Sequence, residues 1–273
     1  MKRNIMRTLF AACVASVMFL ACDPLEPSTY TETFYRVGTI KLNNNGRVTL
    51  VTDILNESLI FKNLVDSADL AANDLKSGQR VIATMTLEAI GSMDNNTITL
   101  NEVRIIPKSK VEDSHPSDTM NYYYKFAVMQ LNEATYPSIW ATGHLINISP
   151  VYFIPRSNCK AEFHLYPITF RNDTLFMRLY SDIPDCDMSL NPDYTQSFLN
   201  YDLSTLRDAA ANPAEQERRD TILARLDRLR SEEFTVHIMT PDTLRAKDTK
   251  NPKGPYLQTV PGLSVSTKVK LDF

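Results

Sequence analysis

The sequence predicts an all-β protein, in which a small barrel is followed by an immunoglobulin-like β-sandwich that carries a helical insertion. Short runs of β-branched and aromatic residues recur along most of the chain and are separated by turn-forming residues. Five such runs fall within about 75 residues, which favours a small barrel. Similar runs resume after a charged, proline-containing segment, and their regular spacing favours a sandwich.

The first 21 residues predict a signal peptide. Lys2, Arg3 and Arg7 precede an uncharged, mostly apolar run over 8–21, and this order is that of a secretory signal. The sequence Phe-Leu-Ala-Cys that ends at Cys22 resembles the lipobox of bacterial lipoproteins, in which cleavage occurs just before a cysteine that then carries lipid. We therefore predict that Cys22 is lipidated by fatty acyl groups such as palmitate. Two or more acyl chains would anchor the protein stably to a membrane.

Two alternatives to this cleavage site stay open. An uncleaved anchor would need about 20 apolar residues, and the run is shorter. Cleavage before Cys13 would need a much shorter apolar core. The proline-rich stretch after Cys22 predicts a lipidated tether over 22–32. Without the three signal cations the chain holds 26 basic against 32 acidic residues, so we expect no nucleic-acid partner.

The predicted barrel covers residues 33–108 and begins with a hairpin. Phe34–Leu42 and Arg47–Thr52 are strand-like, and the asparagine-rich turn between them ends in Gly46, which tolerates a positive φ. The remaining expected elements are a third strand over 58–61, weak helical spacing between 64 and 72, a turn at 75–78 that leads into a strand up to 87, and a fifth strand over 97–106.

Residues 109–120 are the predicted linker, because they hold charges, Pro116 and few apolar residues. The sandwich is then predicted over 121–273. Its last strand alternates apolar and mostly polar residues from Leu263 onward, which is typical of a half-buried strand. The expected strands are 122–131, 139–148, 161–170, 174–180, 234–239 and 263–273.

Cys159 and Cys186 are predicted to form a disulfide. Asn172 and Asp173 tolerate left-handed backbone, so we expect a two-residue hairpin turn there. Without a bulge the numbers of opposed residues then sum to 345, which pairs Phe170 with Leu175, Ile168 with Met177, Tyr166 with Leu179, and Cys159 with Cys186. An exported protein makes the bond chemically reasonable. A single bulge would misalign the cysteines, and two unpaired thiols are the alternative.

The clearest helix begins at Asn212, a preferred N-cap, with Pro213 in the first position and Glu215 in the third. We expect it to reach Arg230. An apolar stripe of Ile222, Leu226 and Leu229, with Leu223 beside it, favours an insertion that packs on the sandwich. The alternative is a helix presented to a protein partner or an anionic membrane surface. The rest of the helix is predicted to be covered by Arg218, Arg219, Asp220, Arg225, Asp227 and Arg228.

The chain resembles the NigD-like lipoproteins of Bacteroidota-type Gram-negative bacteria. The resemblance rests on the lipobox at Cys22, on the turn and strand over 75–81, and on the segment 197–207. It implies an N-terminal OB-like domain and a C-terminal β-sandwich, in the order predicted above. None of these segments is a catalytic motif, so the resemblance implies no catalytic residue.

Two groups of candidate binding or modification residues stand out. OB-like barrels often bind ligands through aromatic side chains on a sheet face, so Phe34, Tyr35 and Phe61 are candidate ligand-contact residues, although such rings usually lie in the core. Several Asp-Ser and Asp-Thr triplets resemble the general O-glycosylation motif of this bacterial group. Used as such, they would expose Ser67, Thr119, Thr174, Thr221 and Thr243.

The motifs of enzymes and metal sites are missing from the sequence. The four histidines have no zinc-ligand spacing, and the cysteines form no Cys-x-x-Cys pair. We therefore expect no catalytic residue, metal or cofactor. The sequence predicts a non-enzymatic lipoprotein of the cell envelope and outer membrane, periplasmic or surface-exposed, that binds an unknown protein or glycan. The alternatives are a glycan-processing hydrolase and a structural subunit that assembles by β-strand addition.

Overall fold

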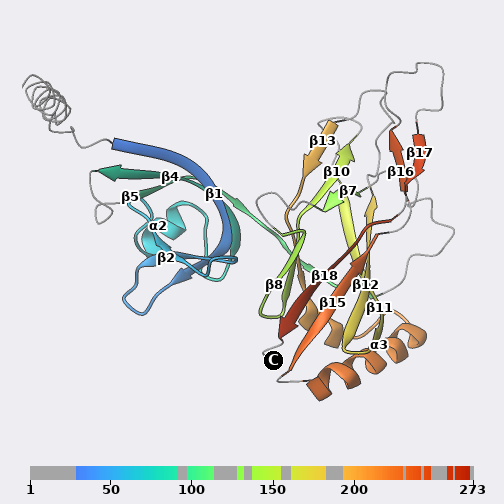
Figure 1. Ribbon diagram of the computed structural model, residues 1–273. Helices are drawn as coiled ribbons and strands as arrows, with labels where there is room; N and C mark the ends of the chain where they lie inside the picture. The colour runs from blue at the N-terminus through green and yellow to red at the C-terminus, as the bar shows by residue number, and fades with distance from the viewer. Residues whose placement is uncertain are drawn as a thin grey trace, which may run out of the picture. The chain divides into compact units, whose positions relative to one another are not determined.

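The computed structural model describes residues 29–90, 97–113, 128–131, 137–154, 161–182, 193–229, 232–240, 243–246, 257–260 and 262–270 (Figure 1). The chain divides into two compact units, with the boundary between Ile105 and Ile106. Strands make up most of the regular structure, so the predicted all-β fold class is confirmed. Each unit has a hydrophobic core of its own.

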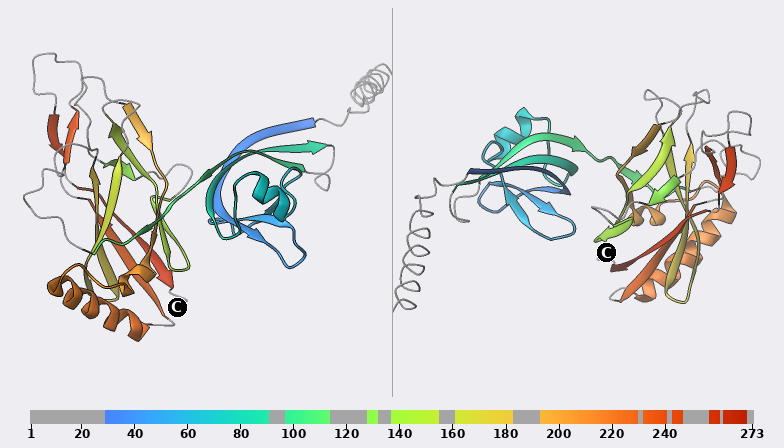
Figure 2. Two further views of the ribbon diagram at one scale, coloured as in Figure 1. Left: turned by 180° about the vertical axis from the view of Figure 1, so that it is seen from behind. Right: turned by 45° about the horizontal axis from the view of Figure 1, so that its top comes forward.

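The first unit is a five-stranded antiparallel sheet that curls around its core (Figures 1 and 2). Helix α2 (Ser67–Ala72) joins the third strand to the fourth. A small five-stranded barrel of this kind is the OB-like architecture that the family resemblance implies. In the sheet order β3-β2-β1-β4-β5, the strands are β1 (Thr29–Leu42), β2 (Val48–Thr52), β3 (Ser58–Ile60), β4 (Arg80–Ile90) and β5 (Thr97–Ile105).

Asn63 joins the two edge strands of this sheet. Its side-chain N–H donates to the carbonyl of Leu100 at 2.8 Å, and its Oδ1 accepts the N–H of Leu100 at 2.9 Å. The N–H of Lys62 donates to the carbonyl of Ile98 at 2.9 Å. The Asn63 amide thus stands in for a strand residue, so β3 and β5 are linked although β3 has only three residues.

A buried ion pair joins the end of β2 to the start of β4. The side chains of Asp53 and Arg80 are 1% and 4% exposed. The Arg80 guanidinium donates to both carboxylate oxygens of Asp53 and, at 2.9 Å, to the hydroxyl of Thr39 on β1. Three strands therefore depend on one charged group, and the loss of either partner would leave an uncompensated buried charge.

The second unit is a sandwich of two four-stranded sheets. One has the order β11-β12-β15-β18 and the other the order β6-β14-β9-β8. Their strands are β6 (Lys108–Lys110), β8 (Ile139–Thr142), β9 (Leu145–Ile148), β11 (Glu162–Arg171), β12 (Thr174–Asp182), β14 (Leu199–Asp202), β15 (Glu233–Met239) and β18 (Ser264–Lys270). A three-stranded sheet holds β7 (Val128–Leu131), β10 (Pro150–Ile154) and β13 (Asp193–Gln196). A two-stranded sheet holds β16 (Thr243–Ala246) and β17 (Leu257–Val260).

The predicted helix closes one end of this sandwich (Figures 1 and 2). It is α3 (Pro213–Leu226), followed by the 3₁₀ turn η4 (Asp227–Leu229), and a second 3₁₀ turn, η3 (Leu203–Arg207), precedes it. The side chain of Asn212 accepts the N–H of Glu215 at 3.0 Å, as expected for the N-cap. Ile222 and Leu226 are buried in the sandwich core, so the interpretation of α3 as a packed insertion is confirmed.

A bulge changes the predicted register of the β11–β12 hairpin. The two-residue turn is confirmed, because Asn172 and Asp173 have φ angles of 48° and 53°. The register then shifts between Pro167 and Thr169, so the predicted pairs Ile168–Met177 and Tyr166–Leu179 are wrong. Pro167 has no N–H to donate to the ladder, which makes its neighbourhood a natural place for an extra residue.

The bulge also removes the reason for pairing the two cysteines. Beyond it, Pro167 faces Met177 and Leu165 faces Leu179, so the numbers of opposed residues sum to 344. Cys159 and Cys186 lie outside the described residues. Their disulfide stays a prediction that no longer has support from the register.

Two boundaries differ from those expected. The tether does not extend to residue 32, because β1 begins at Thr29, where β4 is long enough to pair with it through Ile90. The linker does not begin at residue 109, because Lys108–Lys110 form β6, paired in parallel with β14. Val111 is 3% exposed and belongs to the second core. Its burial explains why a polar-looking segment is ordered.

Replacement of Asp53 by Ala should destabilise the first unit by about 3–5 kcal/mol, because Arg80 then stays buried without its counter-charge. Hydrogen exchange of the β1 and β4 amides, read by mass spectrometry, measures this loss. The control Asp53→Leu/Arg80→Met replaces the pair by apolar side chains and should recover most of the protection. Equal protection in Asp53→Ala and the wild type would contradict the role of the pair.

Candidate functional site

The predicted site residues are only partly described by the structure. Cys22, Cys159, Cys186 and Thr119 lie outside the described residues, so lipidation, the disulfide and that glycosylation stay predictions. The candidate aromatic residue Phe61 is 2% exposed and lies in the core of the first unit, so it offers no face to a ligand. Phe34 packs against the same core, and the Arg36 guanidinium lies 4.7 Å from its ring centre. Tyr35 is half-buried.

The candidate glycosylation residues differ in exposure. Ser67, the first residue of α2, and Thr221 on α3 are exposed. Thr174 is half-buried rather than exposed, because it lies beside Thr235 of β15, which pairs along β12. Thr243 belongs to β16, and its side chain lies outside the described residues.

The second unit presents a basic surface on the outer side of its β11-β12-β15-β18 sheet. Leu175, Val236 and Val269 point into the core, so the alternate residues point outward. In the region where all four strands lie side by side, we call the outward residues whose side chains are at least partly exposed the basic face. They are Thr169, Arg171, Thr174, Phe176, Arg178, Glu233, Thr235, His237, Met239, Ser264, Ser266, Lys268 and Lys270.

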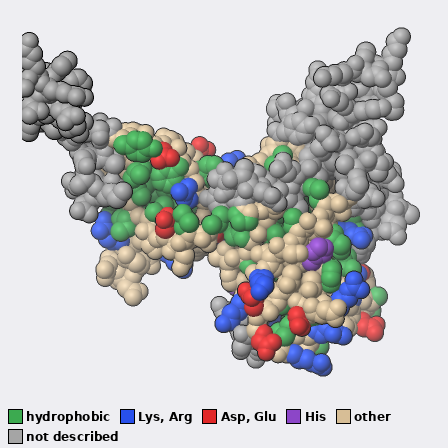
Figure 3. Space-filling model, viewed as in Figure 1, with side chains coloured by type: hydrophobic (Ala, Val, Ile, Leu, Met, Phe, Trp, Pro, Cys, Tyr) green, Lys and Arg blue, Asp and Glu red, His purple; other side chains and the backbone are tan. Residues whose placement is uncertain are grey.

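The charge of the basic face is opposite to that of the whole chain. It carries four Lys and Arg side chains and one carboxylate, whereas the chain has a formal net charge of −3. Figure 3 views the second unit from the side of β15 and β18, where lysine and arginine side chains lie interspersed with acidic ones. Lys268 donates to Glu233 at 2.9 Å, but both side chains are more than half exposed, so water screens this pair. The cations of the face therefore stay accessible to an anion.

A partly exposed ring lies between two nitrogen-bearing side chains on this face. The Arg171 guanidinium lies 4.9 Å from the ring centre of Phe176, within the range of a cation–π contact. The imidazole of His237 approaches the same ring edge-on, with 5.4 Å between centres, and its Nδ1 lies 2.7 Å from the Ser266 hydroxyl. Arg171 of β11 and His237 of β15 thus orient the Phe176 ring.

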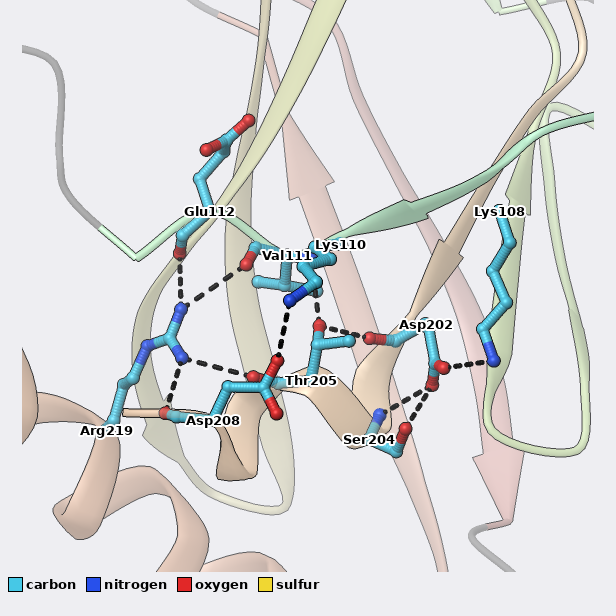
Figure 4. Close-up of polar contacts among 9 residues, drawn as sticks. All are labelled: Lys108, Lys110, Val111, Glu112, Asp202, Ser204, Thr205, Asp208 and Arg219. Atoms are coloured by element: carbon cyan, nitrogen blue, oxygen red, sulfur yellow. Dashed lines mark hydrogen bonds and ion pairs between the residues drawn. The ribbon is translucent and has the colours of Figure 1, made fainter. Parts of the chain in front are cut away.

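Figure 4 shows a second polar group, which fastens the segment 106–113 to the sandwich. Arg219 of α3 points into the end of the sandwich and is 1% exposed. Its Nη1 donates to the carbonyls of Thr205 at 3.1 Å and Asp208 at 3.0 Å. Its Nη2 donates to the carbonyls of Val111 at 3.3 Å and Glu112 at 2.8 Å. One guanidinium thus holds η3, α3 and the segment after β6 together.

The sequence expectation that Arg219 covers the solvent side of the helix is wrong. Arg219 stands three residues before Ile222 and seven before Leu226, so it shares their buried stripe. That spacing was the signal that could have identified it. Burial lowers the pKa of Arg219 from its usual value, while the carboxylates of Asp113, Asp208 and Glu112 act in the opposite direction.

Asp202, the last residue of β14, holds β6 from the other side (Figure 4). Its carboxylate pairs with Lys108 at 2.5 Å and accepts the N–H of Ser204 at 2.9 Å and its hydroxyl at 2.6 Å. Burial alone would raise the pKa of Asp202, but the bonds from Lys108 and Ser204 outweigh it and lower the pKa below its usual value. These contacts are structural, and they fasten β6 and η3 to β14.

The exposed cations of the basic face can attract anions. The sequence analysis did not predict this surface. Its cations come from β11, β12 and β18, which are distant in the sequence, so no local charge run marks them. The alternation of the last strand, with Lys268 and Lys270 at outward positions, was the one available signal. Within the described ranges no cluster of His, Cys, Asp or Glu could hold a metal ion. Those ranges also contain no helix that is long and apolar enough to span a membrane.

No protein-family model and no curated protein matches the sequence. Among solved structures, the chain is similar to a NigD-like immunity protein from Bacteroides caccae, with 13% identity over 88% of this chain and 97% of that one and a TM-score of 0.42. It is also similar to a candidate lipoprotein from Bacteroides fragilis, with 14% identity over 89% and 99% and a TM-score of 0.49. A toxin-related protein from Parabacteroides distasonis shares 11% over 88% and 95%, with a TM-score of 0.47. These structures include a NigD-like protein, the family that the sequence resembles.

Replacement of Arg219 by Met should lower the free energy of unfolding of the second unit by about 3–5 kcal/mol, because four buried carbonyls lose their donor. Urea denaturation, read by the fluorescence of Trp140, the single tryptophan of the chain, measures this loss. The matched control Arg225→Met, on the exposed side of α3, should change it by less than about 0.5 kcal/mol. Equal losses in the two variants would contradict the role of Arg219.

Replacement of Lys108 by Met should raise the pKa of Asp202, because burial is then less opposed. A carboxylate with a lowered folded-state pKa stabilises the fold above its unfolded pKa, and this contribution is lost as the pH falls through the folded value. The variant should therefore lose stability at a higher pH than the wild type, as measured by Trp140 fluorescence between about pH 5 and pH 2.

The matched control for this titration is Lys110→Met, which removes the next cation along β6. Its partner Asp208 is 53% exposed, so the acid-unfolding curve should stay that of the wild type. If the Lys108→Met curve also overlays the wild type, Lys108 does not set the charge state of Asp202.

Proposed function

We propose that the protein is a non-enzymatic lipoprotein of the outer membrane, anchored through Cys22, that binds an anionic partner through the basic face of its second unit. The observation that carries this proposal is the accumulation of four cations and a partly exposed aromatic ring on one sheet face of an acidic protein. Surface charge of one sign on a background of the other attracts and orients partners of complementary charge.

The start of β1 limits how far the first unit can lie from the membrane. The segment from Cys22 to the start of β1 at Thr29 consists of seven residues, 22–28. At about 3.5 Å per extended residue they span at most about 25 Å. The anchor therefore keeps the first unit near the bilayer. The proposal accordingly places the ligand surface on the second unit.

The two buried carboxylates give the hydrolase alternative no support. A glycan hydrolase needs two carboxylates that converge on one bond. Asp53 and Asp202 have side chains less than 5% exposed, but each is bonded to its own cation, and they belong to different units. Both carboxylates have a structural use, so neither supports the hydrolase alternative.

Strand addition at β1 is a second candidate function. The register of β1 with β2 covers only Gly38–Leu42, whereas its pairing with β4 continues to Thr29. Thr31 and Thr33 are exposed and have a strand partner on one side only among the described residues. A strand from another molecule could pair there. On this candidate the wild type should self-associate in analytical ultracentrifugation and Thr31→Pro should be monomeric, because proline removes a backbone donor. A wild type that is monomeric, or a Thr31→Pro variant that associates equally, would contradict it.

Cys22→Ala should abolish labelling by an alkyne fatty acid in growing cells and release the protein from the membrane fraction, because the acylated sulfur is lost. In-gel fluorescence after click coupling measures the label. The matched control Cys13→Ala should keep both label and membrane location. Label that persists in Cys22→Ala, or disappears in Cys13→Ala, would contradict the assignment of the anchor.

A further inference from the structure

We propose that the ligand of the basic face is an acidic polysaccharide, whose sugar rings pack on Phe176 while its carboxylate or sulfate groups pair with Arg171 and Lys268. This inference rests on the proposed function and names the class of partner. It follows from the spacing of the cations and from the chemistry between them.

The cations lie too far apart for one small anion. The register places Arg171 opposite Thr174, Thr174 beside Thr235, and Thr235 opposite Lys268, so these residues form one row across four strands. Three strand spacings separate the ends of the row by about 14 Å. A phosphate or acetate would meet a single exposed cation, and such contacts are weak in water. A chain with repeated charges can meet both ends at once and gain from multivalency.

The neighbouring row suits the uncharged parts of a sugar. It runs from Thr169 through Phe176 and His237 to Ser266. The ring of Phe176 offers an apolar surface to the C–H groups of a sugar, held in place by Arg171 and His237. The hydroxyls of Thr169 and Ser266 can both donate and accept, as sugar hydroxyls require. Arginine adds two parallel donors, which fit a carboxylate or sulfate.

The Lys268–Glu233 pair can be replaced by such a ligand. Lys268 is 71% exposed and Glu233 54% exposed, so the pair contributes little to stability. A ligand carboxylate can take the place of Glu233 on the lysine at small cost. The pair also disfavours weakly charged ligands, because the Glu233 carboxylate competes with them for Lys268.

The composition of the basic face favours a polysaccharide over a membrane surface. Peripheral membrane binding uses exposed apolar side chains together with cations. The large apolar side chains that are exposed among the described residues all belong to the first unit: Tyr30, Leu42, Ile54, Leu55, Ile60, Val65 and Ile105. The basic face therefore offers mainly charge and hydroxyls, and its apolar side chains, Phe176 and Met239, are only partly exposed.

The test compares four defined probes by isothermal titration calorimetry on the mature chain, residues 22–273, with Cys22→Ala, which carries no acyl group that could insert into a vesicle and needs no detergent. The probes are polygalacturonate, neutral dextran of similar length, phosphatidylglycerol vesicles and polyglutamate. Polygalacturonate should bind, and its affinity should fall as salt rises, because the contacts are largely electrostatic. Dextran should not bind measurably, and vesicles and polyglutamate should bind more weakly than polygalacturonate.

Two variants locate the binding on the basic face. Arg171→Gln/Lys268→Gln should weaken polygalacturonate binding about tenfold, which corresponds to two contacts of about 0.7 kcal/mol each. The matched control Arg225→Gln/Arg228→Gln removes two exposed cations from α3 and η4 and should leave the affinity unchanged. Phe176→Leu keeps every charge and should weaken polygalacturonate severalfold while leaving the binding of polyglutamate unchanged.

Each outcome separates this inference from the proposed function. If vesicles or polyglutamate bind more tightly than polygalacturonate, and Arg171→Gln/Lys268→Gln weakens that binding, the ligand class is wrong and the proposed function stands. If none of the anionic probes binds, both are overturned. Equal losses in Arg171→Gln/Lys268→Gln and in the α3 control would show that net charge, not the basic face, carries the binding.

Discussion

The contact of Arg219 with four backbone carbonyls is the interaction on which the lower end of the second unit depends. Backbone carbonyls that leave regular structure must find donors, and those of Thr205, Asp208, Val111 and Glu112 find them in a single guanidinium. The segment after β6 and the turn η3 could not be buried beside α3 without it. The helical insertion is therefore part of the architecture of the second unit.

Local signals predicted local structure well. The Asn212 cap, the Pro213 start and the Asn172-Asp173 turn were all readable, because each depends on neighbours within four residues. The Ile168 bulge and the carbonyl partners of Arg219 were not readable in this way, although the helical spacing of Arg219 placed it on the buried stripe. The bulge reflects how Pro167 fits a ladder whose other strand lies across the turn, and Arg219 is buried because distant carbonyls need it. Both are set by tertiary contacts, which a propensity argument leaves out.

The same distinction explains what was missed at the candidate site. The sequence directed attention to aromatic residues of the barrel, where Phe61 proved to be core. The basic face instead combines Arg171 of β11, Arg178 of β12 and Lys268 of β18, which only the strand order brings together. Each cation taken alone is an ordinary solvated side chain. The parallel β12–β15 pairing places β18 in the same sheet as β11, and this brings the cations onto one face.

Strand alternation decides which residues of β11 and β12 reach the basic face and which reach the core. With Phe170, Leu175 and Met177 turned to the core, Arg171, Phe176 and Arg178 must turn outward. The shift at Ile168 lets Leu165 remain a core residue beyond the bulge while Arg171 keeps its outward position before it. A hairpin without the bulge would place Tyr166 and Ile168 in the core in place of Leu165. The extra residue thus changes only which residues beyond it face the core. The turn-side pairing of Arg171 with Thr174 sets Arg171 beside Phe176, and the bulge leaves that pairing unchanged.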